Sequence, residues 1–356
     1  MNSRERIIAA LQHRESDRIP ITDTTYWPET IERWEKEGLP KGMHPNDYFN
    51  MDKIFLVNPI DAGFSNIFPY EVYEETDEYK IDRNPFGVKV KYWKHKYATH
   101  VELEHAVKCR KDWDEIKRYL SVSEKRLKIE EIEKTHDAYK NGLFVCLTPL
   151  EPFWFSFVMM GVEELMVQMA TAQEFIVDMY NYYTDFLIEM LEKVISKGVY
   201  FDGIWFFSDM CYKNGPLFSP EFYNKFLLPC HSRISEFCHR RNKFLLLHCD
   251  GYVGSLIPGF IHAGFDAIQP LEVRAGNDIR IYKNMYGDKI CLFGNISADI
   301  LAKGDKDAIE EEIRSKISMG KKNGGYIYHI DHSVPPTISF SSYVFALECV
   351  HKYGKF

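Results

Sequence analysis

The chain has 356 residues, of which 45% are hydrophobic and 27% charged, so it can bury one barrel-sized core or two smaller ones. Its formal net charge of −8 gives no basic surface for nucleic acid or for an anionic membrane. No apolar run reaches the roughly 18–20 residues of a spanning helix, and no apolar signal-peptide core follows the N-terminus. We therefore expect a cytoplasmic protein whose eight cysteines are reduced thiols.

The N-terminal third predicts a helix, a short strand and a long excursion. Residues 3–13 are amphipathic, with Ser3 as the expected N-cap, and residues 19–22 form a first strand. The pattern then predicts a helix over residues 29–38 and strands over residues 54–57 and 88–93. We expect a segment of about residues 60–140, charged and helical from 112 onward, to cap one end of the fold.

From residue 143 the chain alternates strands with helices, and a ring-rich loop at 152–155 follows the first of these strands. The predicted strands cover 143–147, 204–207, 243–249, 267–269, 290–293 and 326–330, and the helices cover 161–197 in two pieces, 219–241, a stretch ending at 263, 277–286, 305–322 and 339–353. About eight such units predict a single α/β domain over residues 1–356, a (β/α)8 TIM barrel. A nucleotide-binding sheet is the weaker interpretation, because no glycine-rich phosphate motif follows a strand.

Residues 245–251 have the pattern of a buried parallel strand at its carboxyl end, with three leucines followed by His248, Cys249, Asp250 and Gly251. Because side chains alternate along a strand, His248 and Asp250 point to one side and Cys249 to the other. This pair suits a divalent metal or a proton relay. A core histidine bonded to a neighbouring carboxylate is an equally good interpretation of this stretch alone.

Polar residues end most of the predicted strands, and the loops of one barrel face converge. We therefore expect a functional site at that face rather than incidental surface polarity. The residues at these strand ends are Tyr26, Glu151, Asp209, His248, Asp250, Glu272, Asn295, Asp331 and His332.

The order of several short motifs resembles the uroporphyrinogen decarboxylase superfamily, which includes the decarboxylase and zinc-dependent, corrinoid-linked methyltransferases. The resemblance covers nearly the whole chain. It rests on motifs at residues 4–7, 17–20, 219–223, 248–251, 264–266, 270–272, 293–296 and 331–336.

One departure concerns the decarboxylase branch, which has an arginine-rich stretch after its first strand that suits a substrate with eight carboxylates. Here residues 23–29 read Asp-Thr-Thr-Tyr-Trp-Pro-Glu, with no arginine before Arg33. An aromatic and acidic loop would repel a polyanion. The resemblance therefore favours the methyltransferase branch.

That branch holds zinc through one histidine and two cysteines. Matched residue by residue, the resemblance places His248 at the histidine position, with Asp250 and His332 at the cysteine positions, and Glu272 is a fourth candidate ligand. Carboxylate and imidazole groups bind zinc, but this set also suits a metal-free relay. Two alternatives stay open: Cys249 as a ligand, and His332 as a histidine bonded to Asp331.

The resemblance implies a methyltransferase component that moves a methyl group between a small O-methyl or N-methyl compound and a corrinoid carried by a partner protein. A hard ligand set would let zinc polarise an ether oxygen. We expect Asp209, Glu151 and Asp331 to be catalytic, with Asp209 as the general acid because it follows an apolar strand. The residues expected to bind substrate are Tyr26, Trp27, Trp154, Trp205 and Asn295.

Two other functions remain possible on the sequence, a decarboxylase or lyase acting on another acid and a non-catalytic binding protein. We expect no nucleic-acid or membrane partner, and a monomer or homodimer.

Overall fold

The computed structural model describes residues 1–95 and 100–356, which form two compact units. The first unit comprises Met1–Val57, Glu133–Thr148 and Val199–Phe356, and the second comprises Asn58–Ile132 and Pro149–Gly198.

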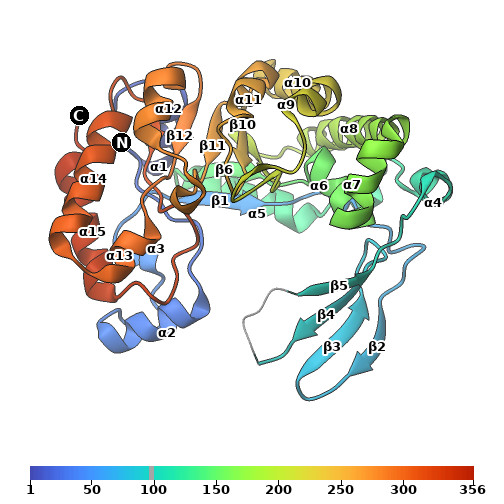
Figure 1. Ribbon diagram of the computed structural model, residues 1–356, viewed down its shortest axis with the longest axis horizontal. Helices are drawn as coiled ribbons and strands as arrows, with labels where there is room; N and C mark the ends of the chain where they lie inside the picture. Colours follow the sequence, from blue (N-terminus) through green and yellow to red (C-terminus); the bar gives the residue numbers. More distant parts are fainter. Residues whose placement is uncertain (96–99) are drawn as a thin grey trace. The chain divides into compact units, whose positions relative to one another are not determined.

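The first unit is built on a curled sheet of seven parallel strands in the order β1-β6-β7-β10-β11-β12-β13 (Figure 1). Ile21 adds a parallel bridge to Tyr328 beyond β13, so the TIM-barrel-like fold predicted from the sequence is confirmed. The strands are β1 Ile54–Val57, β6 Phe144–Leu147, β7 Gly203–Phe207, β10 Phe244–His248, β11 Ala267–Gln269, β12 Cys291–Phe293 and β13 Tyr326–Ile327.

Helices follow the strands of this unit as expected for βα repeats. Several begin at side-chain caps that the sequence indicates, since Ser219 precedes Pro220, Asp305 accepts from the first turn, and Ser339 accepts from Ser342. The helices are α1 Ser3–Leu11, α2 Pro28–Glu37, α3 Pro45–Tyr48, α9 Pro220–Phe222, α10 Leu228–His239, α11 Ile257–Ala263, α12 Ile279–Tyr286, α13 Ala298–Lys303, α14 Lys306–Gly320 and α15 Phe340–Tyr353. α5, Ile129–Lys140, begins in the second unit and ends in the first.

Side chains from alternate positions of the strands fill the barrel interior. Trp205, Leu246, Phe293 and Ile327 are all buried in one apolar cluster. Phe207 and His248, two residues further along β7 and β10, lie on the same side of the sheet as Trp205 and Leu246. The interior core therefore leads directly to the carboxyl ends of the strands.

The second unit contains a four-stranded antiparallel sheet and a group of helices (Figure 1). Val90 is buried between lysines in β4, which matches the alternation expected for a strand with one face in solvent. The elements are β2 Glu71–Glu75, β3 Tyr79–Arg83, β4 Lys89–Trp93, β5 Val101–Glu104, α4 Arg110–Ile116, α6 Pro152–Met160, α7 Val162–Thr171 and α8 Gln173–Ser196.

Several sequence predictions of local structure were wrong. Residues 152–155 belong to α6 instead of a loop, because Glu151 caps the helix and Pro152 occupies its first position. Asn2, not Ser3, caps α1 through a reciprocal bond with Glu5. Residues 19–22 make one isolated bridge, at Ile21, instead of a full strand, since Pro20 has no backbone N–H to donate.

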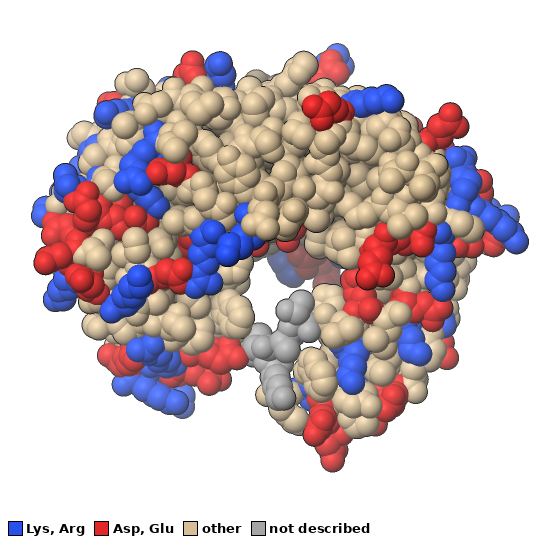
Figure 2. All heavy atoms as spheres, viewed as in Figure 1, with Lys and Arg blue, Asp and Glu red and all other residues tan. Residues whose placement is uncertain are grey.

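Two surface properties bear on the expected partners. No single helix among the described residues is long and apolar enough to cross a membrane, although α6 and α7, bent by 113°, pass that test as a pair. On the face that Figure 2 shows, basic side chains are interspersed with acidic ones. The formal net charge of the chain is −8.

Candidate functional site

Three candidate residues meet at the carboxyl ends of two neighbouring strands. His248 is the last residue of β10 and pairs with Phe207 at the end of β7. Because the strands are parallel and in register, Asp250 and Asp209, each two residues further on, also lie side by side. The backbone N–H of Asp250 donates to Asp209 Oδ1 over 3.0 Å, which fixes the two loops against each other.

The donor atoms of these three residues form one cluster. His248 Nε2 lies 3.7 Å from Asp209 Oδ1 and 3.7 Å from Asp250 Oδ1, and all three ligand atoms lie within 4.8 Å of one another. Two zinc ligands in tetrahedral geometry are roughly 3.4 Å apart when each is about 2.1 Å from the ion. Each carboxylate therefore needs to approach His248 Nε2 by only a few tenths of an ångström for the pair to share a divalent ion.

The neighbours of His248 favour a cation between it and the carboxylates. Its Nδ1 is bonded to Gln269 Oε1, an oxygen that only accepts, so Nδ1 carries the proton. In this tautomer the lone pair of Nε2 faces one oxygen of Asp209 and one of Asp250. The lone pair and the two carboxylates repel each other unless a proton or a metal ion lies between them. Asp250 Oδ1 is also buried without a hydrogen-bond partner among the described residues.

The carboxylates of the site differ in how deeply they are buried. Burial raises the pKa of Asp250, while His248 lowers it and Asp209 raises it further. Burial also raises the pKa of Asp331, although bonds from two backbone N–H groups lower it. The side chain of Asp209 is 43% exposed. The expectation that desolvation acts most strongly on Asp209 was therefore wrong, because its apolar strand ends before the carboxyl group.

The other polar candidates of the first unit lie around this cluster with different partners. His332 Nδ1 is 3.8 Å from Asp250 Oδ2, on the side away from His248, and its side chain is exposed. Glu272 accepts from the N–H of Gly251, over 3.0 Å. Asp331 accepts from Val273 and Ala298 and so joins two loops. The ligand roles of His332 and Glu272 and the catalytic role of Asp331 stay predictions.

The candidates for substrate binding differ widely in what they contact. Asn295 is buried, and its amide bonds Leu271, Asn277 and Ile279 backbone groups, so it organises loops.

Two rings of the same group are buried as well. Trp205 is fully buried and stacks on Phe207, whose ring in turn lies tilted by 32° against His248. The Tyr26 hydroxyl is bonded to Asn46 and Tyr343. Trp27 is exposed. Trp27 is therefore the most accessible of these rings, and the substrate-binding role of each stays a prediction.

Two further candidates lie in the second unit. Glu151 is fully buried and accepts from the N–H of Trp154 over 2.8 Å, which makes it the cap of α6. Trp154 stacks on Phe157, with ring centroids 4.6 Å apart. Their predicted roles, catalytic for Glu151 and substrate binding for Trp154, stay predictions.

Sequence reasoning missed a buried polar group beside β13. Asp23 lies 3.4 Å from His329 Nδ1 and accepts hydrogen bonds from Tyr343 and from the N–H of Ile330. Burial raises the pKa of Asp23 to about 7 and lowers that of His329 to about 4. The spacing of 306 residues between the partners explains why no local pattern revealed them.

Comparisons with known proteins agree with this architecture. The family model described as uroporphyrinogen decarboxylase (URO-D) matches residues 83–353. Two curated uroporphyrinogen decarboxylases, from Geobacter sulfurreducens and Geotalea uraniireducens, are 24% and 25% identical over 142 residues. That match covers 40% of this chain and 40% of each relative.

A solved structure described as a methyltransferase from Methanosarcina mazei is similar over 99% of both chains, with 15% identity and a TM-score of 0.66. At that identity the likeness establishes the fold.

Proposed function

We propose that this chain, which belongs to the uroporphyrinogen decarboxylase (URO-D) family, is a methyltransferase component. It would transfer a methyl group between a small methylated compound and a corrinoid protein. The observation that carries the proposal is the donor cluster of Asp209, His248 and Asp250 at the carboxyl ends of β7 and β10. The methyltransferase fold neighbour supports the same reaction class.

The residues of this cluster fit a zinc ion. One imidazole and two carboxylates give three protein ligands, which leaves a position open for substrate, and His332 or Glu272 would complete the set. Bound there, zinc would supply Lewis-acid polarisation of the oxygen or nitrogen that carries the methyl group. Gln269 would fix the orientation and the proton of the His248 ring, as is usual for the outer partner of a metal-binding histidine.

The chain's own residues would orient the substrate and manage a proton. The Phe207 ring lies tilted against the His248 ring, with centroids 5.1 Å apart, and would shield the imidazole on the interior side. Asp250, whose pKa burial raises, would be held as a carboxylate only with a cation beside it. Asp209, the more exposed carboxyl, would exchange a proton with solvent as the leaving group departs in the alternative in which His248, Asp250 and His332 hold the ion and Asp209 does not bind it.

Residues 23–29, which follow the bridge at Ile21, argue against a polycarboxylate substrate. Asp23 is buried and Trp27 exposed, and the stretch offers no cation. The first arginine beyond it, Arg33, bonds the carbonyl of Pro336 and forms an ion pair with Glu37. Binding of uroporphyrinogen needs several free cations, which this part of the chain does not supply.

The direct test supplies a corrinoid protein reduced to Co(I) together with a methoxyarene, methanol or a methylamine. Methyl transfer would be recorded as loss of the Co(I) absorbance and formation of the methylated corrinoid. We expect one donor class to react and His248→Ala to abolish the reaction, while His262→Ala, which alters an exposed histidine of α11, leaves it intact. Equal rates in His248→Ala and wild type would refute the proposed site.

A further inference from the structure

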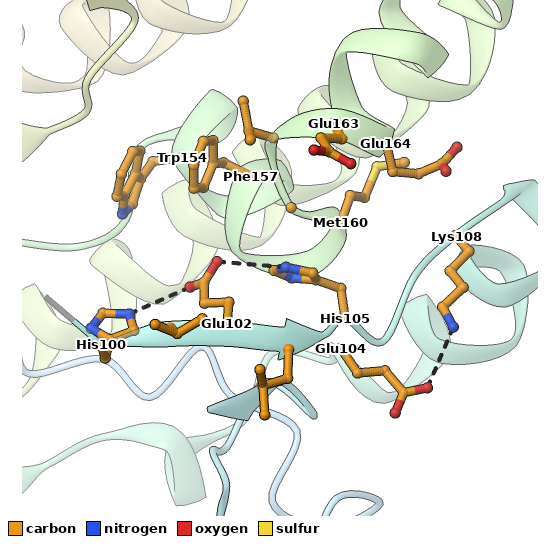
Figure 3. Close-up of a pocket in the computed structure, with 14 residues that line it drawn as sticks. His100, Glu102, Glu104, His105, Lys108, Trp154, Phe157, Met160, Glu163 and Glu164 are labelled. Carbon is orange, nitrogen blue, oxygen red and sulfur yellow. Dashed lines mark hydrogen bonds and ion pairs between the residues drawn. The ribbon is translucent and has the colours of Figure 1, made fainter. Parts of the chain in front are cut away.

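The second unit contains a groove of about 990 Å³ that includes none of the donor-cluster residues proposed for methyl transfer, although it includes Trp154, a predicted substrate-binding residue (Figure 3). One wall is the six consecutive residues His100–His105, which include all of β5. Successive side chains of a strand point to opposite faces, so a groove that touches every one of them runs along the strand's edge. The other wall is α6 and the first turn of α7.

The edge of β5 that faces away from β4 is open. Within the described residues β5 is the last strand of its sheet and pairs with β4 alone. An edge strand presents a row of backbone N–H and C=O groups to any chain that approaches in an extended conformation. Val101 and Leu103 are 45% and 48% exposed, and they alternate with Glu102 and Glu104, so β5 combines exposed apolar side chains with acidic ones that would repel an acidic strand and attract a basic one.

The side chains of the groove define what an occupant would carry. Trp154 and Phe157 stack on each other, and Met160 adds to the same apolar wall. Four glutamates line the groove against one lysine, Lys108, which is 3.4 Å from Glu104. Figure 3 shows His100 and His105 on either side of Glu102, each 3.6 Å from one of its oxygens. With the histidines neutral the lining has a net charge of −3 (one lysine less four glutamates).

We propose that this groove binds an extended, lysine- or arginine-rich segment of a partner protein, which adds to the free edge of β5 as a further strand. Backbone hydrogen bonds to β5 would hold the segment, and an apolar side chain between its basic residues would lie on Trp154 and Phe157. Its cations would meet Glu102, Glu163 and Glu164. The inference does not rest on the donor cluster proposed for the first unit, and it gives Trp154 a peptide-binding role in place of the predicted substrate-binding one.

The test uses the full chain and a labelled peptide of about six residues, the usual length of a strand, in which lysine alternates with valine. Binding is followed by fluorescence anisotropy. We expect saturable binding that weakens with salt, and no binding of the peptide in which glutamate replaces lysine. Methylating alternate backbone nitrogens of the peptide removes two or three hydrogen bonds and should weaken binding at least ~10-fold. Equal binding of the methylated peptide would overturn the added strand.

Matched variants locate the contact. Glu163→Gln combined with Glu164→Gln should weaken the peptide by about 5-fold, whereas Glu130→Gln combined with Glu133→Gln, exposed glutamates of α5, should not. Trp154→Leu should weaken it about 10-fold. Equal effects of the two glutamate pairs would overturn the site. Complete competition by tetramethylammonium would also overturn it and indicate a pocket for small organic cations instead.

Discussion

Asp23→Asn tests whether the buried carboxyl beside β13 is uncharged in the folded protein. Its pKa is raised from 3.8 to about 7 because the group is fully buried. Asparagine has the shape of the protonated acid, and it can accept from Ile330 and donate to Tyr343. We therefore expect the variant to fold and to differ from wild type in the pH dependence of its stability.

The sign follows from proton binding. Between about pH 4 and pH 7 the folded protein holds a proton on Asp23 that the unfolded chain has lost, so the free energy of unfolding falls as pH rises. The stabilisation is complete below the unfolded pKa and lost as pH passes the folded value. From pH 5 to pH 7 the loss is about 1.4 kcal/mol per unit, or about 3 kcal/mol in total. The variant should lack that loss and be the more stable protein at pH 8.

The assay is urea denaturation of wild type and variant at pH 5 and pH 8. His329 titrates in the same window with the opposite sign, since its pKa is lowered to about 4, and the raised pKa values of Tyr26, Tyr328 and Tyr343 keep those rings neutral. His329 is present in both proteins, so the difference between them reports the titration of Asp23 together with its effect on His329, which lies 3.4 Å away. Asp77→Asn, in an exposed turn, is the control. A variant less stable than wild type at pH 8 would show that Asp23 is a stabilising carboxylate and refute the reasoning.

Two further predictions concern the proposed chemistry. His248→Ala should lose most of its bound zinc by elemental analysis, and His332→Ala a smaller part, because His332 is exposed and lies 3.8 Å from Asp250. Full zinc content in both variants would contradict the ligand assignment. Purified protein should not convert uroporphyrinogen to coproporphyrinogen, because residues 23–29 offer no cation for its carboxylates; porphyrin product analysis decides this, and product above background would return the chain to the decarboxylase branch.

The sequence predicted the positions of residues that lie on a single strand. The leucines before His248 predicted β10, and the two-residue period placed His248 and Asp250 on one side. The strand ends also predicted that Asp209 lies near this pair, but as the general acid; that its carboxylate joins the donor cluster depends on the pairing of Phe207 with His248 across two strands. Asp23 and His329 are further apart still, and neither lies in a recognisable motif. Local periodicity thus gave the elements, while register and burial decided which polar side chains meet.

A gain of signal can identify the metal ligands without relying on loss of activity. Asp250 stands where the methyltransferase pattern that the sequence resembles has a cysteine, and Asp250 Oδ1 faces His248 Nε2. Asp250→Cys would place a sulfur in the cluster, and cadmium, a soft ion that takes zinc sites, gives a thiolate charge-transfer band in the ultraviolet.

Wild type is the internal control for this experiment because it already contains a cysteine next to the cluster. Cys249 is fully buried, and burial raises the pKa of its thiol well above the usual value, so it resists forming the thiolate that a metal needs. Cadmium should therefore give no band in wild type and a stoichiometric band in Asp250→Cys. A band of equal size in wild type would make Cys249 the ligand, and no band in Asp250→Cys, with the fold intact by circular dichroism, would remove Asp250 from the metal site.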